Sequence, residues 1–570
     1  MKLRKLAAFA FIIYALFYLL LFLQFPLNNS IGAHCDGLLA VTISNSMFNY
    51  LGCIFTGAHF TTSMFPVENI FQYGESSFGC LIIIMFFKLI GCSDIYSWYF
   101  FVVTLFALNG LGMFLVSYHF TKNFHASIIA GFFLTCSNFV FINIDDIHVF
   151  FYFLTFLAIF FLLKHKETQK NKFLLISSVL MGLQIYTSLY AFAYGSIIFV
   201  VVFIYSLNYF RKIKYKKIII VACCAAIYLI IIAPLILFYL RTKMSPNFFD
   251  PNDLWQGVIS LYTIKFSDLF KVMPNSLFYS SSFQESSILF EIRRSAFIGF
   301  LFMGISLFCV IRYFRKYFIW VLFVFIGLLL STNIIYSLFP FLGVLRVPYR
   351  AYFISIIAFS LLASIGFGSL FKKISTRKQL LITVVILSIH FIENIPNPFP
   401  LANFETVQQE ALVKKDIKLG DGFCPINFIP NDKLSEAVNH IDKKSAILCL
   451  PSKNIFGDKY TGSLTYSREI IYMIHQTYFK RNMFNGLNGY YPKTRVLLQS
   501  YIEELPKETS LQQLITSGMT HIIFYKNMVL TPQEDILKSL EDSNMLHLIS
   551  ESNDFALFEV VVKKSFPPNT

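Results

Sequence analysis

Residues 345–378 read LRVPYRAYFISIIAFSLLASIGFGSLFKKISTRK. The middle of this stretch, Ala351–Phe371, carries no charged residue and has the length of about 20 residues that a helix needs to cross a bilayer. Two arginines precede it, and Lys372, Lys373, Arg377 and Lys378 follow it. Because positive charge in short loops marks the cytoplasmic side, this stretch predicts a membrane helix and its direction.

The whole chain has the composition of an integral membrane protein. Of its 570 residues, 56% are hydrophobic, only 14% are charged and 68 are Phe, and the mean hydropathy is +0.62. A soluble core cannot bury that much apolar surface. The net charge is +15, but the basic residues lie in short loops between apolar segments. We therefore interpret them as topology signals and exclude a nucleic-acid-binding surface.

Apolar segments of nearly membrane length recur through residues 1–395, which we expect to form one multispanning domain. The first segment follows Lys2, Arg4 and Lys5 and precedes no small-residue cleavage site, so it predicts a retained anchor with a cytoplasmic N-terminus. The expected spans are Leu6–Phe25, Phe78–Gly91, Tyr96–Tyr118, Ala126–Ile144, Val149–Leu163, Phe173–Leu189, Gly195–Phe210, Ile218–Tyr239, Ala296–Ile311, Tyr317–Leu330, Ala351–Phe371 and Leu380–Ile395.

Basic turns predict the topology. Four of them are expected to face the cytoplasm, at residues 164–172, 211–217, 312–316 and 372–378. If Lys122 and His125 also face the cytoplasm, the chain must cross the membrane an odd number of times between the first outer loop and that turn. Two apolar segments, Phe78–Gly91 and Tyr96–Tyr118, lie in this interval, so one of them is not expected to be a full span. Phe78–Gly91 is short and carries Lys88, so we expect about 11 full crossings plus a partial one, with about 13 as the alternative. With a cytoplasmic N-terminus, either count of crossings places the C-terminus outside. The expected location is the plasma (inner) membrane.

A second domain is expected from residue 396 to 570, after a proline-containing linker. Its short apolar runs alternate with segments of helical spacing, which predicts an extracytoplasmic α/β domain of two or three layers. The expected strands are Ala446–Leu450, His521–Tyr525 and Asp554–Val562, and the expected helices are Ser467–Tyr478, Lys493–Glu504 and Pro532–Leu540. Cys424 and Cys449 are candidates for a disulfide in an oxidising compartment.

Polar and ionisable residues gather in the loops expected to face outward. The first outer loop, residues 26–77, is long for a connector, and such loops are often functional. Carboxylates and imidazoles can deprotonate a hydroxyl or hold a divalent cation, and guanidinium groups bind phosphate through two hydrogen bonds. This chemistry suits group transfer from a phosphate-linked lipid to a hydroxyl. The long outer loop 241–295 carries further polar and aromatic residues, namely Asp250, Asp253, Trp255, Asp268, Glu285, Arg293 and Arg294. The site candidates are Asp36, Glu75, Asp146, His148, Gln184, Tyr190, Arg346 and Arg350.

Several of these residues also have a structural explanation. Asp36 can instead cap an apolar helix that follows it. Asp146 can end a membrane span in the headgroup layer, and the arginines can anchor the interface. Tyr190 fits the aromatic belt that lines membrane boundaries. The functional hypothesis therefore depends on their joint occurrence on one side.

Short stretches along nearly the whole chain resemble the GT-C membrane glycosyltransferases, and within them the YfhO-like membrane proteins of bacteria and archaea. The stretches in the membrane part are Met64–Pro66, Tyr73–Ser76, Leu111–Met113, Asn143–His148, Leu183–Tyr190 and Leu345–Arg350. Those in the tail are Ile447–Pro451, His475–Thr477, Asn485–Pro492 and Gly518–Tyr525.

The resemblance implies an inverting transferase. It would move a hexosyl or pentosyl unit from a polyprenyl-phosphate-sugar, its co-substrate, to a hydroxyl of an envelope glycan, lipid or protein. An acidic residue of the first outer loop would act as base or as partner of a divalent cation, with Asp36 as the first candidate and Glu75 as the second. Asp146 or His148 would orient the acceptor or the cation. The expected partners are the lipid-linked donor and the membrane lipids.

The substrate contacts follow from the same resemblance and from the residue types. Arg346 and Arg350 are expected to hold the donor phosphate, with Gln184 and Tyr190 as further contacts. Two other classes remain open. A transporter or flippase would need repeats or half-helices near the bilayer midplane, and a non-catalytic envelope-assembly scaffold would make the outer acidic residues dispensable.

Overall fold

The structure is a computed structural model. It describes residues 3–22, 78–207, 215–246, 248–249, 263–270, 296–338, 347–394, 430–452, 469, 471–473, 475–476, 478–486, 491–526 and 534–561. These described residues form two compact units. Of the described residues, the bundle takes 3–22, 78–207, 215–238, 263–270, 296–338 and 347–394, and the tail unit takes 239–246, 248–249 and those from 430 onward.

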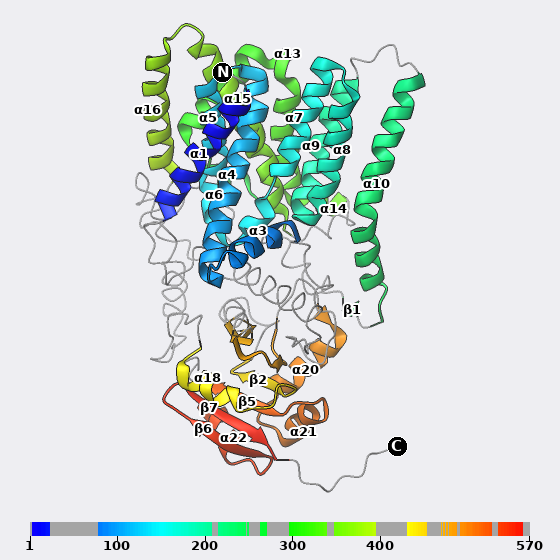
Figure 1. The fold of residues 1–570 in the computed structure, drawn as a ribbon, viewed down its shortest axis with the longest axis vertical. Coiled ribbons are helices and arrows are strands. Elements are labelled where there is room, and N and C mark those ends of the chain that lie inside the picture. Colours follow the sequence, from blue (N-terminus) through cyan, green and yellow to red (C-terminus); the bar gives the residue numbers. More distant parts are fainter. Residues whose placement is uncertain are drawn as a thin grey trace. The chain divides into compact units, whose positions relative to one another are not determined.

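The bundle consists of long helices that run roughly side by side (Figure 1). Its longer helices are α1 Leu3–Phe22, α4 Asp94–Thr121, α5 Phe124–Thr135, α7 Phe153–Thr168, α8 Asn171–Leu183, α9 Leu189–Leu207, α10 Tyr215–Lys243, α13 Phe300–Leu330, α15 Tyr352–Phe371 and α16 Thr376–Asn394. Its shorter elements are α3 Phe78–Leu89, α6 Asn138–Ile142, η2 Ile144–Phe150, η3 Gln184–Tyr186, η4 Phe266–Phe270, α14 Asn333–Leu338 and η6 Pro348–Ala351.

Seven segments of the described chain are long and apolar enough to cross a membrane. They are Leu3–Phe22, Tyr96–Thr121, His148–Thr168, Leu189–Ser206, Ile218–Lys243, Phe300–Leu330 and Pro348–Phe371. Three more expected spans correspond to α5, α8 and α16, and the longest of the seven contains two expected spans. Together these helices agree with the expectation of about 11 crossings for a polytopic helical membrane protein.

Helix α13 is the segment that contains two spans. Its helical geometry is interrupted at Tyr313 and Tyr317, on either side of Arg315 and Lys316. Before the interruption the chain runs beside α15 in the same direction, because Phe302 contacts Phe359 and Ile305 lies against Gly366.

The second half of α13 returns along α15. Tyr317 contacts Phe120 near the last turn of α4. The Ser355 hydroxyl, close to the start of α15, donates to the Val324 carbonyl at 2.8 Å. Contacts that run forward in one half and backward in the other define a helical hairpin. The basic turn predicted at residues 312–316 is therefore confirmed.

Helix α3 was the segment suspected of not crossing, and the structure supports this. It has 12 residues and lies across one end of the bundle in Figure 1. Cys80 donates its thiol proton to the Thr187 carbonyl at 3.4 Å, and Phe87 stacks on Phe100 near the start of α4. Both ends of α3 thus lie at the same end of the bundle.

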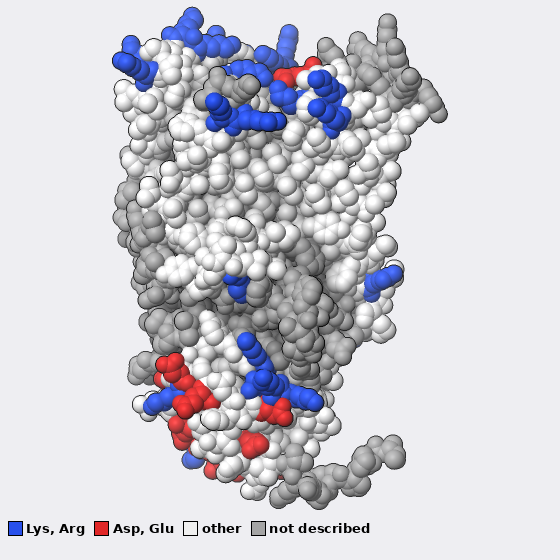
Figure 2. Space-filling view, viewed as in Figure 1, with Lys and Arg blue, Asp and Glu red and all other residues white. Residues whose placement is uncertain are grey.

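Lysines and arginines gather at one end of the bundle, which we call the basic end (Figure 2). Glu167 binds Lys164 at 2.8 Å and Lys122 at 3.4 Å, which joins the ends of α7 and α4. The Asn123 amide donates to Gln379 at 3.0 Å and so connects α5 to α16. Turns that are far apart in sequence therefore lie together, as the alternation of basic loops predicts.

The expected span Ala126–Ile144 differs in the structure. Helix α5 ends at Thr135, and a separate short helix α6 begins at Asn138. The Ser137 hydroxyl donates to the Leu134 carbonyl, and the Asn138 amide proton is bound by the Asn394 side chain at 3.0 Å. A long-range partner of this kind stabilises a break that apolar character alone does not reveal.

The tail unit is a five-stranded sheet with helices on both faces. The strand order is β3 (Asn482–Met483), β2 (Ala446–Leu450), β5 (His521–Tyr525), β7 (Phe555–Val560) and β6 (Leu546–Glu551). Strands β3, β2 and β5 are parallel, while β7 and β6 are antiparallel. A separate short pair joins β1 (Phe248–Phe249) to β4 (Tyr491–Pro492).

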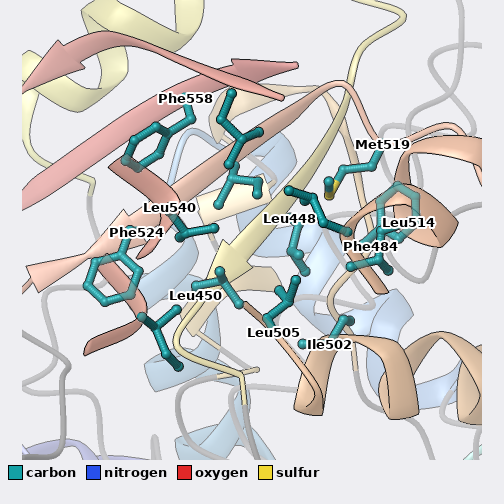
Figure 3. Close-up of a cluster of buried hydrophobic side chains, with 14 of the residues drawn as sticks. Leu448, Leu450, Phe484, Ile502, Leu505, Leu514, Met519, Phe524, Leu540 and Phe558 are labelled. Carbon is teal, nitrogen blue, oxygen red and sulfur yellow. The ribbon is translucent and has the colours of Figure 1, made fainter. Parts of the chain in front are cut away.

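Alternating side chains of the sheet form two apolar cores. Leu448 and Phe524 point to the face covered by helices α20 (Lys493–Glu503), α21 (Glu508–Thr516) and α22 (Glu534–Glu541) (Figure 3). Ile447 and Ile523 point to the other face, where α18 (Asp432–Asn439) and Tyr472 pack. The expected α/β domain therefore has three layers.

The two central strands of the tail have the predicted bounds. Helices α18 and α21 and strand β6 were not predicted. Cys449 is buried, and its candidate disulfide partner Cys424 lies outside the described residues, so this pairing stays a prediction. Burial, with the charge of Glu469 as a smaller contribution, raises the pKa of the Cys449 thiol well above its ordinary value.

Candidate functional site

Irregular backbone lies at the end of the bundle opposite the basic turns, which we call the polar end. It comprises η2, η3 with Thr187 and Ser188, residues 296–299, and η6. The Ser188 hydroxyl reaches the Val149 carbonyl at 3.5 Å, which joins the second of these turns to the first. Non-helical backbone at membrane depth is tolerated only where protein buries it or it lines a cavity. The polar end is therefore the candidate site of the bundle.

Arg350 and Tyr190 form the central contact of this end. The guanidinium carbon of Arg350 lies 4.5 Å from the centre of the Tyr190 ring, a cation–π geometry. Arg350 is 7% exposed, although it is charged. Pro348 opens the turn that carries it, since a fixed φ suits the first position of a helical turn. Two predicted substrate residues, distant in sequence, are thereby brought together.

Further aromatic side chains surround this pair. The hydroxyls of Tyr194 and Tyr336 lie 3.4 Å apart, and Tyr190 packs against Tyr194. Tyr349 is fully buried against Phe139. Aromatic walls with few polar groups are typical of sites that bind the apolar part of a ligand and orient its polar part.

His148 belongs to the same polar end. It lies in η2 and is 7% exposed. Phe150, two residues later, contacts Phe353 at the start of α15, close to the turn of Arg350. The backbone of Asp146 lies in the same 3-10 turn. The structure therefore places η2 beside the elements that carry the arginine and the tyrosine.

Gln184 is buried and its amide is occupied by the chain. Its oxygen accepts from the backbone N–H and the hydroxyl of Thr155, at 3.0 and 3.1 Å. Its nitrogen donates to the Phe151 carbonyl at 2.8 Å and to the Thr187 hydroxyl. This residue fixes the start of α7 against η3, a structural role that the sequence analysis did not assign.

A buried polar group on α16 was missed. His390, Glu393 and Asn394 are at most 7% exposed and lie beside Gly299, just before α13. The Glu393 carboxylate accepts hydrogen bonds from the backbone N–H groups at the start of α13. An ionisable residue in a membrane span indicates a functional site by default. The presence of His390 and Glu393 inside the predicted span Leu380–Ile395 is therefore the sequence signal that could have identified this group.

Asp36, Glu75 and Arg346 lie outside the described residues. Among the residues that are described, no group of three or more His, Cys, Asp or Glu side chains could hold a metal ion. The expected divalent cation therefore stays a prediction.

No protein-family model matches the chain, and no curated protein matches it either. Solved structures do match the chain. The arabinofuranosyltransferase AftD from Mycobacteria aligns with a TM-score of 0.54 and 11% sequence identity, over 99% of this chain and 42% of that chain. This chain has the GT-C fold.

The chain spans less than half of the length of AftD, and at 11% identity the likeness shows the fold alone. ArnT from Cupriavidus metallidurans also aligns, with a TM-score of 0.38 and 11% identity over 97% of this chain and 98% of that chain. The GT-C fold agrees with the superfamily resemblance seen in the sequence, whereas the YfhO-like placement stays a prediction.

Proposed function

We propose that the protein is a membrane glycosyltransferase that moves a sugar from a polyprenyl-phosphate donor to an envelope hydroxyl. The observation that carries the proposal is Arg350, whose buried guanidinium lies over the Tyr190 ring at the polar end of a GT-C fold. A guanidinium is planar and always charged, so it can bind two phosphate oxygens at once. The ring holds it in place through the cation–π contact.

In the proposed reaction the acceptor oxygen forms a bond to the anomeric carbon while the bond from that carbon to the phosphate oxygen breaks, with inversion. The acceptor proton passes to the carboxylate of Asp36, and Glu75 is the second candidate for that base. The leaving phosphate takes the electron pair, and Arg350, with Arg346, stabilises the developing charge. Preorganised cationic groups of this kind commonly supply much of the rate enhancement.

We assign the acceptor side to η2. Asp146 and His148 would orient the acceptor hydroxyl, or a divalent cation if the enzyme uses one. The polar end would face outward, because the lysine and arginine turns at the other end carry the signal for the cytoplasm. This topology puts the C-terminus and the tail unit outside the cell.

The positions of the irregular turns favour this proposal over a transporter. Transporters carry discontinuous helices near the bilayer midplane. In the described part of the bundle, the 3-10 turns η2, η3 and η6 lie at helix ends, and the break in α13 lies at the basic end. A site at a membrane boundary suits chemistry on a lipid headgroup.

The test is sugar transfer by the full chain in lipid nanodiscs. The donors would be polyprenyl phosphates carrying radiolabelled arabinose, mannose or glucose, with extracted envelope glycan as acceptor. Arg350→Ala should lower kcat/KM for the donor by about 100-fold, the effect of removing one preorganised charge. Arg377→Ala, which removes an exposed arginine at the basic end, is the matched control and should leave transfer unchanged. Equal transfer by the two variants would refute the phosphate role of Arg350.

A further inference from the structure

The segment Ala296–Gly299 connects several elements at the polar end. The Ala296 amide donates to the Asp268 carbonyl at 2.9 Å, and its own carbonyl accepts from the Tyr352 hydroxyl at 2.8 Å. Tyr352 comes two residues after Arg350, at the point where η6 becomes α15. A shift of residues 296–299 should therefore also move Tyr352 and, with it, the turn that carries Arg350.

The Glu393 side chain holds this segment from the opposite side. Its carboxylate faces the backbone N–H groups of Phe300 and Leu301 at the start of α13. A helix offers no acceptor of its own to its first N–H groups, so a carboxylate at this position acts as a cap. A negative charge at a helix N-terminus is also favoured by the helix dipole. Glu393 thus caps a helix that lies far from it in the sequence.

Gly299 makes this contact possible. Its φ is +91°, a conformation that side-chain-bearing residues rarely adopt. A Cβ atom at this position would lie 2.7 Å from the Glu393 Oε2 atom and 3.0 Å from the Asn394 side-chain nitrogen. The absence of a side chain therefore lets the carboxylate come close to the start of α13.

Asn394 and His390 fix the end of α16 that carries the carboxylate. Asn394 Nδ2 donates to the His390 carbonyl at 2.8 Å and lies 3.1 Å from its Nδ1 atom, while Oδ1 accepts from the Asn138 amide. Phe133 packs against the imidazole with ring centres 4.4 Å apart. These contacts leave the carboxylate little freedom to move away from Gly299.

We infer that Glu393 is a positioning residue for the donor site: it caps α13, fixes residues 296–299, and through Tyr352 holds the turn of Arg350. This inference rests on the proposed phosphate role of Arg350. Glu393 itself touches neither substrate nor reacting atoms. A shift of the guanidinium by about 1 Å can cost about 100-fold in rate, so a distant cap can matter for catalysis.

The kinetic test uses Glu393→Ala, Glu393→Gln and the double variant Glu393→Ala with Arg350→Lys in nanodiscs. Glu393→Ala should lower kcat/KM for the polyprenyl-phosphate donor by about 10- to 100-fold. Glu393→Gln should recover part of it, because its amide oxygen still accepts from the two N–H groups. The Arg350→Lys change should cost much less in the Glu393→Ala background than in the native chain, because both act on one contact. Additive losses would overturn the inference.

Thr383→Val is the matched control. Thr383 is buried on the same helix, and its hydroxyl donates to Gln379 one turn earlier, away from the cluster at Gly299. A merely structural weakening of α16 should affect both variants alike. If Thr383→Val loses as much transfer as Glu393→Ala, the positioning role is wrong.

Hydrogen–deuterium exchange provides a measurement that does not need activity. Amides of residues 347–353 should exchange faster in Glu393→Gln and Glu393→Ala than in the native chain, and Thr383→Val should leave them unchanged. Unchanged exchange in the Glu393 variants would overturn the connection between Glu393 and the Arg350 turn. If the native chain transfers no sugar while the Glu393 variants still exchange faster than the native chain at residues 347–353, only the proposed function is refuted and the connection between Glu393 and the Arg350 turn stands.

Discussion

Two buried carboxylates, Glu393 in the bundle and Glu469 in the tail unit, show opposite solutions to the same physical problem. A buried charge is unfavourable unless it is paired and hydrogen-bonded. Glu469 is completely buried and has Arg495 at 3.6 Å. Glu393 is met by backbone N–H groups, and no lysine or arginine among the described residues pairs with it.

The surroundings of Glu469 are saturated. It accepts from the Asn485 amide at 3.0 Å, from the Gly486 N–H at 3.0 Å and from the Ser452 hydroxyl. These partners lie at the carboxyl ends of β2 and β3, where parallel sheets commonly bind ligands. In this domain the polar groups at that edge are used to hold the loops together.

The surroundings of Glu393 are less complete. Its Oε2 atom has no hydrogen-bond partner among the described residues, and the same holds for Nε2 of His390. Buried polar atoms without partners are unfavourable and call for an explanation. The comparison teaches that a saturated environment fits a structural charge, while the incomplete environment of Glu393 is what the proposed site at the polar end predicts.

The largest expected effect tests the saturated partner. Arg495→Met leaves Glu469 as an uncompensated buried charge and should destabilise the tail unit by about 3–5 kcal/mol. The double variant with Glu469→Gln removes both charges and should recover most of that loss. Hydrogen–deuterium exchange of β2 and β5 in the full chain measures both changes. Lys507→Ala, at an exposed ion pair with Glu504, should leave the exchange unchanged.

If Arg495→Met alone behaves like the double variant, the distinction between the two carboxylates is lost. That outcome would mean that Glu469 is stabilised by its hydrogen bonds without help from the cation, as Glu393 is.

An intermediate effect is expected from Gly299→Ala. The substitution forces a side chain into a positive φ and places its Cβ against the Glu393 carboxylate, so the bundle should lose about 1–3 kcal/mol. Gly304→Ala is the matched control on α13, because no atom lies within 4 Å of the Cβ it would introduce. It should cost nothing, since alanine is the better helix former. Thermal unfolding in nanodiscs measures both, and equal melting temperatures would contradict the close approach at Gly299.

The smallest effect uses pH to perturb the tail unit on its own. Burial lowers the pKa of His521 below its ordinary 6.5. The unfolded chain then binds the proton first, so the tail unit should lose stability as the pH falls below about 6.5. His521→Gln should flatten that dependence, as followed by exchange of β5 between pH 7.5 and 5.5. A slope that persists in the variant would assign it to another group.

The sequence predicted what depends on local pattern. Ala446–Leu450 and His521–Tyr525 have the expected bounds because buried parallel strands are continuous apolar runs. The hairpin within α13 followed from its basic residues at 312–316, and the partial crossing at α3 followed from its length.

What the sequence missed depends on contacts between distant segments. The partner of Glu393 is the start of α13, and the ring under Arg350 comes from α9. Neither pairing has a local signature. Gln184 was predicted as a substrate contact from its place in a motif, but its four hydrogen bonds to the chain could be known only from the fold.

Helices α15 and α10 differ sharply in how much of them the protein itself surrounds. In the most apolar stretch of α15, 83% of the residues are buried, against 17% for α10. Lipid tolerates any apolar side chain of suitable size, whereas a packed interior discriminates by shape. Over evolutionary time α10 should drift freely while α15 keeps its small and aromatic pattern. When remote homologues are aligned, the residue pattern of α15 should therefore be recognisable even at low sequence identity, whereas that of α10 should not.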